Sequence, residues 1–305
     1  MKTDFASLYE LFEAIPDEQA AIDHFTAIHW KHGEHCPYCG SVRLFHFSDK
    51  RTHKCADCRR RFSIKVGTVF EGTKIPLRKW LAAIWLITSN RKGIASTQLA
   101  RDIAVTQKTA WFMLHRLRHA ARTRSFNRSL KGEVEVDETA VGGLEKNKHA
   151  WKREHKGTGT VGKTIVLGLL ERGGELRTEV IQEANAATLH PIVKAHVELD
   201  ARLYTDGWAA YRGLGEIYQH ETVNHGAGEY ARGAVSTNSI EGVWAILKRQ
   251  IIGVHHWISP KHLPRYLAEI TWRYNRHGST EGGRVSEFLS RTHGRLRYVD
   301  LIAKV

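Results

Sequence analysis

The four cysteines of the chain fall in two C-x-x-C pairs, and this spacing limits how the surrounding segment can fold. They are Cys36 and Cys39, then Cys55 and Cys58, with fifteen residues between the pairs. Each pair can present two thiolates from a tight turn, and two such turns complete the tetrahedron that Zn²⁺ prefers. Two disulfides would instead require an oxidising compartment, but the N-terminus shows acids and helical periodicity, not a secretion signal. The spacing therefore predicts a zinc site.

The residues around these cysteines predict a zinc ribbon over 31–72. Strand-like runs lie at 42–47 and 51–54, and a basic, aromatic run covers 59–70. Because four thiolates leave no open coordination position, we expect the metal to stabilise the fold and not to catalyse a reaction. The ribbon is then expected to contact DNA through basic residues such as Arg60.

The charge of the chain indicates what it binds. Its formal net charge is +14 over 305 residues, with a pI near 9.7. Such an excess favours a polyanionic partner, usually nucleic acid, although a ribosome-associated or merely soluble basic protein would share it. The longest apolar run, 80–87, is far shorter than the roughly 20 residues of a membrane helix. We therefore expect a cytoplasmic, nucleoid-associated protein that binds double-stranded DNA.

Helices are predicted before and after the ribbon, over 1–30 and 73–128. The second segment contains two short amphipathic helices joined by a turn, with Thr106 as the N-cap of the second. This pattern is typical of a helix-turn-helix, whose second helix enters the major groove, although a basic structural hairpin would look similar. The positions expected to be exposed on that helix are Gln107, Lys108, His115, Arg116 and Arg118. Of these, Gln107, Lys108 and Arg116 are the candidate DNA contacts.

An α/β domain is predicted over 129–290, followed by a C-terminal tail over 291–305. The expected strands are EVEVD, GKTIVLGLLER, ELRTEVIQE, ARLYTD and IYQHETVNH. A helix separates the third strand from the fourth, and two more helices follow the fifth. This order suits a ribonuclease-H-like mixed sheet flanked by helices, in which the first and fourth strands lie side by side.

Two of these strands are expected to end in an aspartate, Asp137 and Asp206, which would meet at one edge of the sheet. Glu241, on a following helix, can complete the cluster. Carboxylates brought together repel one another unless cations neutralise them, and hard oxygen ligands select Mg²⁺ or Mn²⁺. Two such ions, roughly 3.5–4 Å apart, support in-line phosphoryl transfer. Glu135 lies one step back from the expected strand end, and Glu138 points to the opposite face, so Asp137 is preferred.

The third acid has a rival in Glu269, but that residue lies in a helix predicted to pack in the core. Glu241 is preferred because Lys248 follows it by seven residues and so shares its helical face. One helix would then carry a carboxylate for metal and a lysine for phosphate, with Arg249 as a further DNA contact. The alternative is a solvated amphipathic helix.

Several motifs together resemble the DDE-type transposases of bacterial insertion sequences that carry an N-terminal zinc ribbon and an integrase-like catalytic domain. The similarity runs from about Phe5 to Phe288 and includes the ribbon upstream. Its motifs are EVDETAVGG with NKH after it, LYTDGW and STNSIEGVWAILKRQIIGVHHWISPKHLPRYLAEITWRYNRH. The resemblance implies a ribonuclease-H-like fold, divalent metal, and strand cleavage and transfer at terminal inverted repeats by an oligomer on DNA.

By position, the family's acids match Asp137, Asp206 and Glu241, and its end-contacting lysine matches Lys248. Relatives often have His-Thr-Asn where this chain has Ser-Thr-Asn at 236–238. Because some relatives use asparagine or histidine as the third catalytic residue, Asn238 stays a minor candidate. Two other functions remain open: a non-catalytic zinc-ribbon and helix-turn-helix regulator, and a metal-dependent nuclease without strand transfer.

Overall fold

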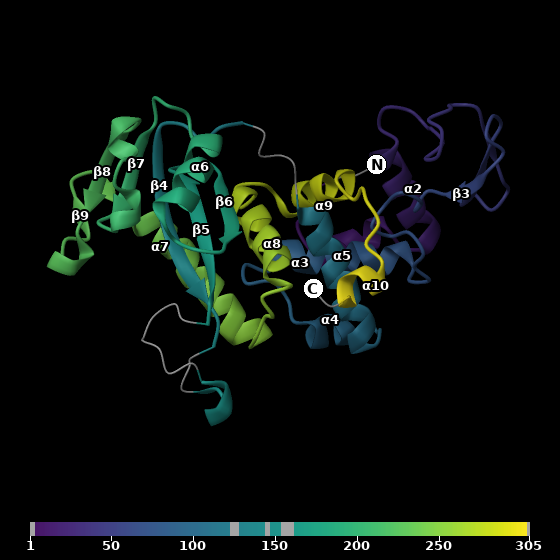
Figure 1. Ribbon diagram of the computed structural model, residues 1–305. Coiled ribbons are helices and arrows are strands. Elements are labelled where there is room, and N and C mark those ends of the chain that lie inside the picture. Colours follow the sequence, from purple (N-terminus) through teal and green to yellow (C-terminus); the bar gives the residue numbers. More distant parts are fainter. Residues whose placement is uncertain (1–3, 123–127, 144–146, 154–161, 304–305) are drawn as a thin grey trace. The chain divides into compact units, whose positions relative to one another are not determined.

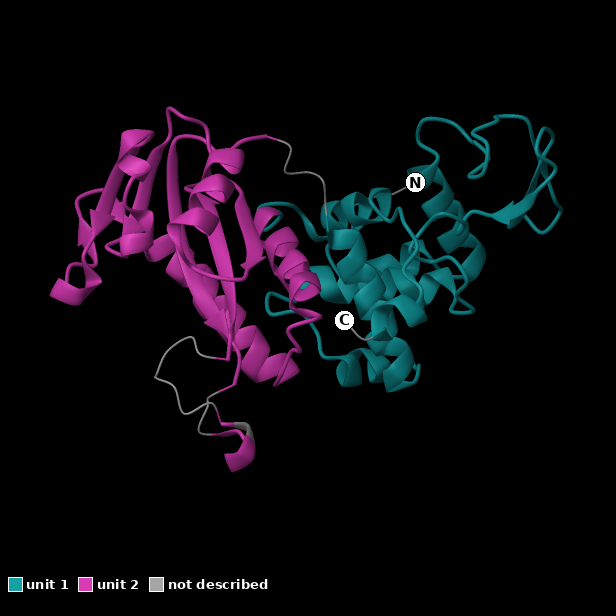
Figure 2. Cartoon of the chain, viewed as in Figure 1, with its two compact units in different colours: residues 1–122, 276–305 teal, residues 123–275 magenta. Residues whose placement is uncertain are grey.

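The computed structural model describes residues 4–122, 128–143, 147–153 and 162–303 (Figure 1). The chain divides into two compact units (Figure 2): the first comprises residues 1–122 and 276–305, and the second comprises residues 123–275. The second unit is therefore an insertion between two parts of the first. Within the described ranges, no helix combines the length and apolar character that crossing a membrane requires.

The first unit begins with two helices and a small sheet. The helices α1 (Leu8–Ala14) and α2 (Glu18–His29) are capped by the Ser7 and Asp17 side chains. The strands β1 (Leu44–His46), β2 (Thr52–Cys55) and β3 (Arg61–Ser63) then form an antiparallel sheet in chain order. The strand-like runs around the cysteines thus form the sheet of a ribbon.

Three helices follow: α3 (Leu77–Ser89), α4 (Ser96–Asp102) and α5 (Gln107–Ala121). Thr106 caps α5 as predicted, accepting a hydrogen bond from the Thr109 backbone N–H at 3.2 Å. The basic face of α5, however, is not exposed. His115, Arg116 and Arg118 are 0%, 5% and 1% exposed, so the prediction that they face solvent is wrong.

Arg116 is buried and forms hydrogen bonds with the segment at 69–71, which follows β3 and is called the ribbon exit below. Its Nη1 donates to the carbonyl oxygens of Val69 and Glu71, both at 2.9 Å. Burial lowers the pKa of Arg116, with a smaller effect in the same direction from Arg295. The guanidinium therefore ties α5 to the ribbon exit and is not available to contact DNA.

The end of the chain completes the first unit. Helix α9 (Glu281–Ser290) buries Val285, Phe288 and Leu289 and packs against α2 and α3, and the short α10 (Tyr298–Ile302) follows. Residues 291–295 lie along the ribbon exit, where the Val69 N–H donates to Thr292 O at 2.8 Å. The α/β unit thus ends at Asn275, not at the predicted 290, because α9 has its core partners in the first unit.

The second unit contains a five-stranded mixed sheet in the order β6-β5-β4-β7-β8. β5 is antiparallel to both β6 and β4, whereas β7 runs parallel to β4 and to β8. This is the predicted ribonuclease-H-like order, in which the first and fourth strands of the unit along the chain, β4 and β7, are paired. The strands are β4 (Glu133–Val141), β5 (Thr164–Glu171), β6 (Leu176–Ile181), β7 (Arg202–Asp206) and β8 (Gln219–Val223).

Helices cover both faces of this sheet (Figure 1). On one face, α6 (Ala186–His196) packs Leu189 and Val193 against the sheet. On the other, α7 (Asn238–Gln250) and α8 (Leu263–Asn275) form a second apolar cluster with β5 and β6. The short hairpin of β9 (Ala231–Arg232) and β10 (Val235–Ser236) leads into α7.

Replacing Arg116 with leucine should destabilise the first unit without changing DNA contacts directly. The variant removes the donor to two carbonyl oxygens, and a buried polar group left unpaired costs about 1–3 kcal/mol. Differential scanning calorimetry should show a lower unfolding temperature for Arg116→Leu, whereas Lys92→Gln, at an exposed position, should change the free energy of unfolding by no more than about 0.5 kcal/mol. An equally stable Arg116→Leu protein with weakened DNA binding would contradict this.

Candidate active site

The register between β4 and β7 brings the two predicted aspartates together. The last parallel pair is Glu135 with Tyr204, and Asp137 and Asp206 each lie two residues further along their strands. Neighbouring strands are about 4.8 Å apart, and residues two positions apart point to the same face. Asp137 and Asp206 therefore project side by side from one face, where β4 and β7 cease to pair.

The expectation that Asp137 ends its strand is wrong. β4 continues to Val141, and Asp137 pairs with Gly168 of β5. The strand continues because β5 supplies antiparallel partners over its whole length, although β7 does not. Asp206 does end β7 as predicted. The site therefore forms at the end of the β4–β7 pairing, with β4 passing through it.

Helix α7 supplies the third acid and also contacts Asp137. The Trp244 Nε1–H donates to Asp137 Oδ2 at 2.9 Å. Glu241 lies one turn earlier, and its Oε1 accepts a hydrogen bond from Thr237 Oγ1 at 3.3 Å. Each acid thus has one oxygen held by the protein, because Asp206 Oδ1 accepts from the Trp208 backbone N–H at 3.0 Å.

The carboxylates interact electrostatically but do not converge on one point. Burial raises the pKa of Asp137 to about 6; the hydrogen bond from Trp244 opposes this, and the charges of Asp206 and Glu241 add to it. Among the described residues, only the four cysteines form a group of three or more metal-ligand side chains whose donor atoms all lie within 4.8 Å of one another. The three acids are thus close enough to repel one another but more widely spread than the ligands of a single small ion.

Glu138 lies on the opposite face of β4 from Asp137, as alternation predicts. Its carboxylate accepts a hydrogen bond from the hydroxyl of Tyr211, which is buried beneath α6. Burial raises the pKa of Glu138 to about 7, the hydrogen bond from Tyr211 opposes this, and Asp137 and Asp206 raise it further. The charges of Asp137 and Asp206 therefore act on Glu138 even though its side chain lies on the opposite face of the sheet.

The other rival acids have structural partners. Glu135 is fully buried and bonds Arg172 Nε at 2.7 Å. Glu269, predicted to pack in the core, is 2% exposed and pairs with Arg273 of the same helix. Asn238 is exposed at the start of α7. The structure thus gives Glu135 and Glu269 cationic partners of their own.

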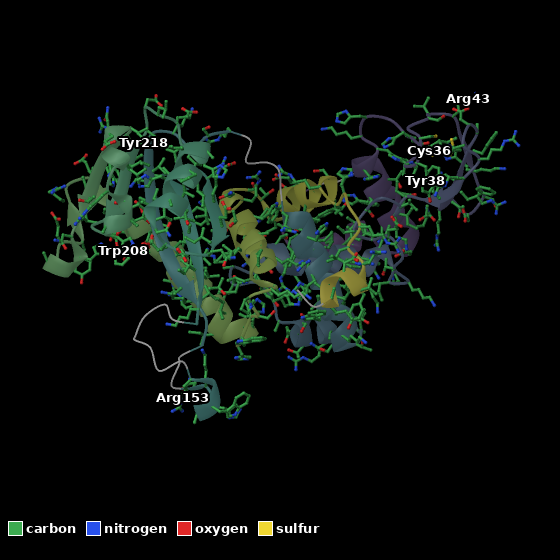
Figure 3. The ribbon with its side chains drawn as sticks, viewed as in Figure 1. Cys36, Tyr38, Arg43, Arg153, Trp208 and Tyr218 are labelled. Carbon is green, nitrogen blue, oxygen red and sulfur yellow. The ribbon has the colours of Figure 1, made fainter. Side chains whose placement is uncertain are left out.

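The four cysteines predicted to bind zinc lie together in the ribbon, where Figure 3 labels Cys36. Cys36 Sγ lies 3.6 Å from Cys58 Sγ, and Cys39 Sγ lies 3.6 Å from Cys55 Sγ, with all four sulfurs within 4.8 Å of one another. A tetrahedron with Zn–S bonds of 2.3 Å requires sulfurs about 3.8 Å apart. The backbone N–H groups of Tyr38 and Cys58 also donate to Cys36 Sγ and Cys55 Sγ, both at 3.4 Å. The four cysteines therefore form a site that fits zinc.

Most of the predicted DNA contacts are exposed, Arg116 excepted. Lys248 and Arg249 are exposed near the end of α7. Arg60 is exposed on the ribbon, with its guanidinium 3.5 Å from the ring centre of Tyr38. Gln107 and Lys108 are exposed in the first turn of α5, although Gln107 also donates to Ser96 Oγ at 2.8 Å. The accessible polar surface of α5 is therefore its N-terminal turn.

Several residues at the site were not anticipated from the sequence. Trp244 holds Asp137, and Gly168 opposite leaves room for it. His225 lies with Nε2 3.6 Å from Glu241 Oε1 and stacks on Tyr230. Trp208, two residues after Asp206, is 54% exposed. Trp244 could have been found from the sequence, because it is an aromatic residue one helical turn after Glu241 in EGVW. No sequence pattern indicated that His225 would lie near Glu241.

A mixed sheet of this order, with aspartates on its two parallel central strands and a glutamate on the covering helix, is the architecture of the DDE-type transposases. Comparison with known proteins agrees. Residues 129–275 match the ISXO2-like transposase domain, and residues 16–61 match the transposase zinc-ribbon domain. Together with the relatives described next, these matches show that the chain belongs to the DDE-type transposases that carry a zinc ribbon.

The relatives include a protein of a transposable element and a transposase-like protein. A protein of transposable element ISH50 from Halobacterium salinarum is 31% identical over 264 residues, covering 82% of this chain and 88% of the relative. A transposase-like protein of Haemophilus influenzae is 31% identical over 99 residues, covering 32% of this chain and 79% of the relative. The Mos1 strand transfer complex is a structural neighbour with a TM-score of 0.30 and 13% identity, covering 74% of this chain and 82% of the neighbour.

Replacing Cys55 with serine should remove zinc and unfold the ribbon. The Cys55 side chain is fully buried, and a ribbon of three short strands depends on its metal for most of its folding free energy. Metal analysis of the wild type should give one zinc per chain, and Cys55→Ser should give little. Limited proteolysis should then cut within 31–72 first and leave the sheet of the second unit intact. A full zinc content in the variant would refute the assignment.

Replacing Gly168 with alanine should force Trp244 away from β5. A Cβ at this position would lie 2.5 Å from Trp244 Cζ2 and 2.8 Å from Ile240 Cδ1. Overpacking of this kind costs about 1–3 kcal/mol, which urea unfolding and Trp fluorescence can measure. Gly242→Ala is the matched control, because its Cβ meets no atom within 4 Å and helical Gly→Ala changes stabilise by about 0.4–1 kcal/mol. Equal stability of the two variants would contradict this packing.

Proposed function

We propose that this transposase binds the terminal inverted repeats of an insertion sequence and catalyses metal-dependent cleavage and transfer of DNA strands. The observation that supports this best is the register of β4 and β7, which puts Asp137 and Asp206 two residues beyond the same parallel pair. Glu241 comes from the helix whose Trp244 bonds Asp137. These three acids are the proposed catalytic residues.

The donor set suits a divalent cation. Burial and the neighbouring carboxylates make the ionised form of Asp137 costly, and a cation would remove that cost. Carboxylate oxygens are hard ligands, so Mg²⁺ or Mn²⁺ is preferred over softer metals. Because the three carboxylates do not all lie within 4.8 Å, two ions shared among them fit the arrangement better than one.

In the proposed reaction, the protein supplies position and charge. When bound, the metal ions would activate the attacking oxygen and stabilise the leaving oxygen. Trp244, Thr237 and the Trp208 backbone would keep one oxygen of each acid in place, so that the other faces the metal. The same acids would serve water in strand cleavage and a DNA 3′-hydroxyl in strand transfer, because both are in-line displacements at phosphorus.

DNA would be held by basic side chains of both units. The net charge of +14 supports binding that falls steeply with salt, since each phosphate contact releases counterions. Lys248 and Arg249 would contact the transposon end beside the acids, and the ribbon with Arg60 and the first turn of α5 would bind the repeat. Joining two ends in one event would require at least two copies of the chain on DNA.

Replacing Asp137 or Asp206 with asparagine, or Glu241 with glutamine, should abolish strand cleavage. Each change removes a charged ligand but nearly keeps the side-chain shape, so binding to the transposon end should stay within a fewfold of wild type. Removal of a metal ligand at such a site should reduce the cleavage rate at least a hundredfold. Cleavage of a labelled terminal duplex with Mg²⁺ and a gel-shift assay of binding measure the two effects.

Asp200→Asn is the matched control, because this exposed acid lies before β7, at the opposite end from Asp206, and should leave cleavage unchanged. The same assay with a plasmid target separates the other functions. A regulator would bind the duplex without Mg²⁺-dependent nicking in any variant. A nuclease would nick without preference for the end sequence and would not join strands.

A further inference from the structure

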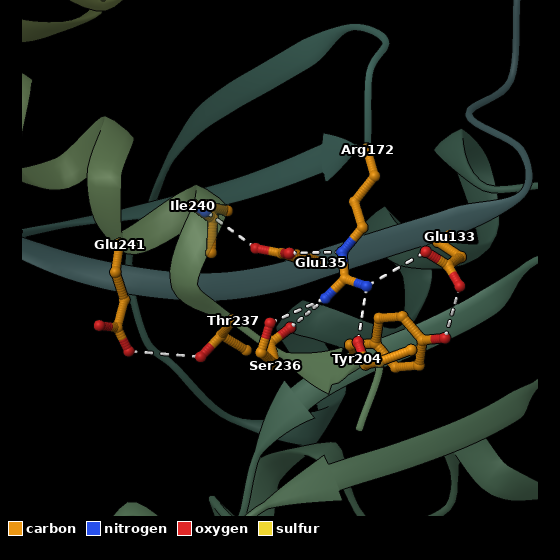
Figure 4. A network of polar contacts seen from close by, with 9 residues as sticks. Glu133, Glu135, Arg172, Tyr204, Ser236, Thr237, Ile240 and Glu241 are labelled. Atoms are coloured by element: carbon orange, nitrogen blue, oxygen red, sulfur yellow. Dashed lines mark hydrogen bonds and ion pairs between the residues drawn. The ribbon is translucent and has the colours of Figure 1, made fainter. Parts of the chain in front are cut away.

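Arg172 is the centre of a polar network at the start of α7 (Figure 4). It follows β5 directly, at the turn into β6. Its Nε donates to Glu135 Oε1 at 2.7 Å, and its Nη1 donates to Glu133 Oε2 at 3.1 Å and to Ala234 O at 2.6 Å. Its Nη2 donates to both Ser236 O and Ser236 Oγ at 2.9 Å. A guanidinium has five N–H donors, so this one is fully used.

The network joins β4 to the segment that enters α7. Glu133 and Glu135 belong to β4, whereas Ala234 and Ser236 belong to the hairpin that leads into the helix. The guanidinium also lies 4.5 Å from the ring centre of Tyr204, whose hydroxyl donates to Glu133 at 3.0 Å. Arg172 therefore fixes the position of the chain two residues before α7 begins.

Glu135 extends the network into the helix itself. Its Oε2 accepts a hydrogen bond at 2.9 Å from the backbone N–H of Ile240, in the first turn of α7. The N-cap residue, Thr237, makes no capping bond with its side chain. The free N–H groups of a first helical turn need an acceptor, and here a fully buried carboxylate from β4 provides it.

Helix α7 is thus attached to β4 by two hydrogen bonds, and the distance between them along the strand matches the distance between them along the helix. Glu135 bonds the backbone of Ile240, and Asp137 bonds the side chain of Trp244. Residues two apart on a strand are separated by about 6.7 Å along it, and residues four apart on a helix rise about 6 Å. The two bonds therefore fit one relative position of helix and strand, and Glu241 lies between them on the helix.

We propose that the Arg172–Glu135 ion pair positions Glu241 for metal binding by fixing the first turn of α7 on β4. This inference rests on the proposed function, because it requires that Glu241 be a metal ligand. Arg172 and Glu135 are positioning residues: they act through the place that they give to Glu241. Breaking the pair lets the first turn of α7 shift relative to Asp137 and weakens the affinity of the site for its cation.

The test compares metal dependence in Arg172→Gln and wild type, using the full zinc-loaded chain below the unfolding temperature of each protein. Mn²⁺ binding is titrated by electron paramagnetic resonance, and nicking of a labelled terminal duplex is measured over a range of Mn²⁺ concentrations. We expect both the Kd for Mn²⁺ and its half-maximal concentration for nicking to rise at least tenfold. Saturating Mn²⁺ should restore most of the nicking rate. A loss of stability alone would lower the unfolding temperature but leave the Mn²⁺ dependence unchanged.

Arg128→Gln is the matched control, because Arg128 pairs with Glu171 at 2.8 and 3.0 Å on the same strand end but bonds no part of α7. It should keep the wild-type Mn²⁺ dependence. If Arg172→Gln does not fold, Glu135→Gln is tested in the same assay. The Glu135 carboxylate accepts from Arg172 with one oxygen and from the Ile240 N–H with the other, whereas an amide has a single acceptor oxygen and cannot keep both bonds. Wild-type Mn²⁺ dependence in the folded variant overturns the inference.

The variant Glu241→Gln separates this inference from the proposed function. If it nicks with wild-type Mn²⁺ dependence, Glu241 is not a ligand and the proposed catalytic assignment fails. If it loses nicking at all Mn²⁺ concentrations while Arg172→Gln behaves as wild type, the assignment stands and only the positioning role is lost.

Discussion

Parallel pairing between β4 and β7 is the constraint on which the candidate site depends. The two strands are far apart in the sequence, yet three register pairs are enough to align Asp137 with Asp206. A slip of one residue would turn either aspartate to the other face of the sheet. Val134 and Leu203 resist such a slip because they are buried beneath α6 in the same cluster. The apolar core on one face thus determines where the acids project on the other.

Helix α7 must meet a stricter requirement than burial. Its apolar residues Val243 and Leu247 would pack against the sheet in several slightly shifted positions, because dispersion contacts have little directionality. Hydrogen bonds are directional, and those made by Glu135 and Asp137 favour one position. A buried ion pair contributes little net stability compared with an apolar pair of the same size. The ion pair between Arg172 and Glu135 therefore contributes mainly to the position of the helix and little to net stability.

Sequence patterns anticipated the sheet order, the ribbon and the position of Asp137 and Asp206 on neighbouring strands, because these depend on local periodicity and on spacing. Predictions from these patterns were wrong where contacts with residues distant in the sequence determine the structure. Asp137 is in the middle of a strand because β5 continues to pair beyond it, although the apolar alternation weakens there. Arg116 is buried because carbonyl groups more than forty residues away accept its hydrogen bonds. Likewise, nothing in the residues near Arg172 indicates that its main partners lie on β4 and before α7.

The insertion of the second unit within the first has a consequence for synthesis. The chain makes the ribbon and the helices α1 to α5 early, but their partner α9 and the strip at 291–295 come last. The first unit can thus complete its core only after residues 281–295 have been synthesised, whereas the sheet of the second unit has all its strands before then. A prematurely terminated chain would therefore carry the complete sheet with its acids beside a first unit that lacks α9 and so cannot close its core.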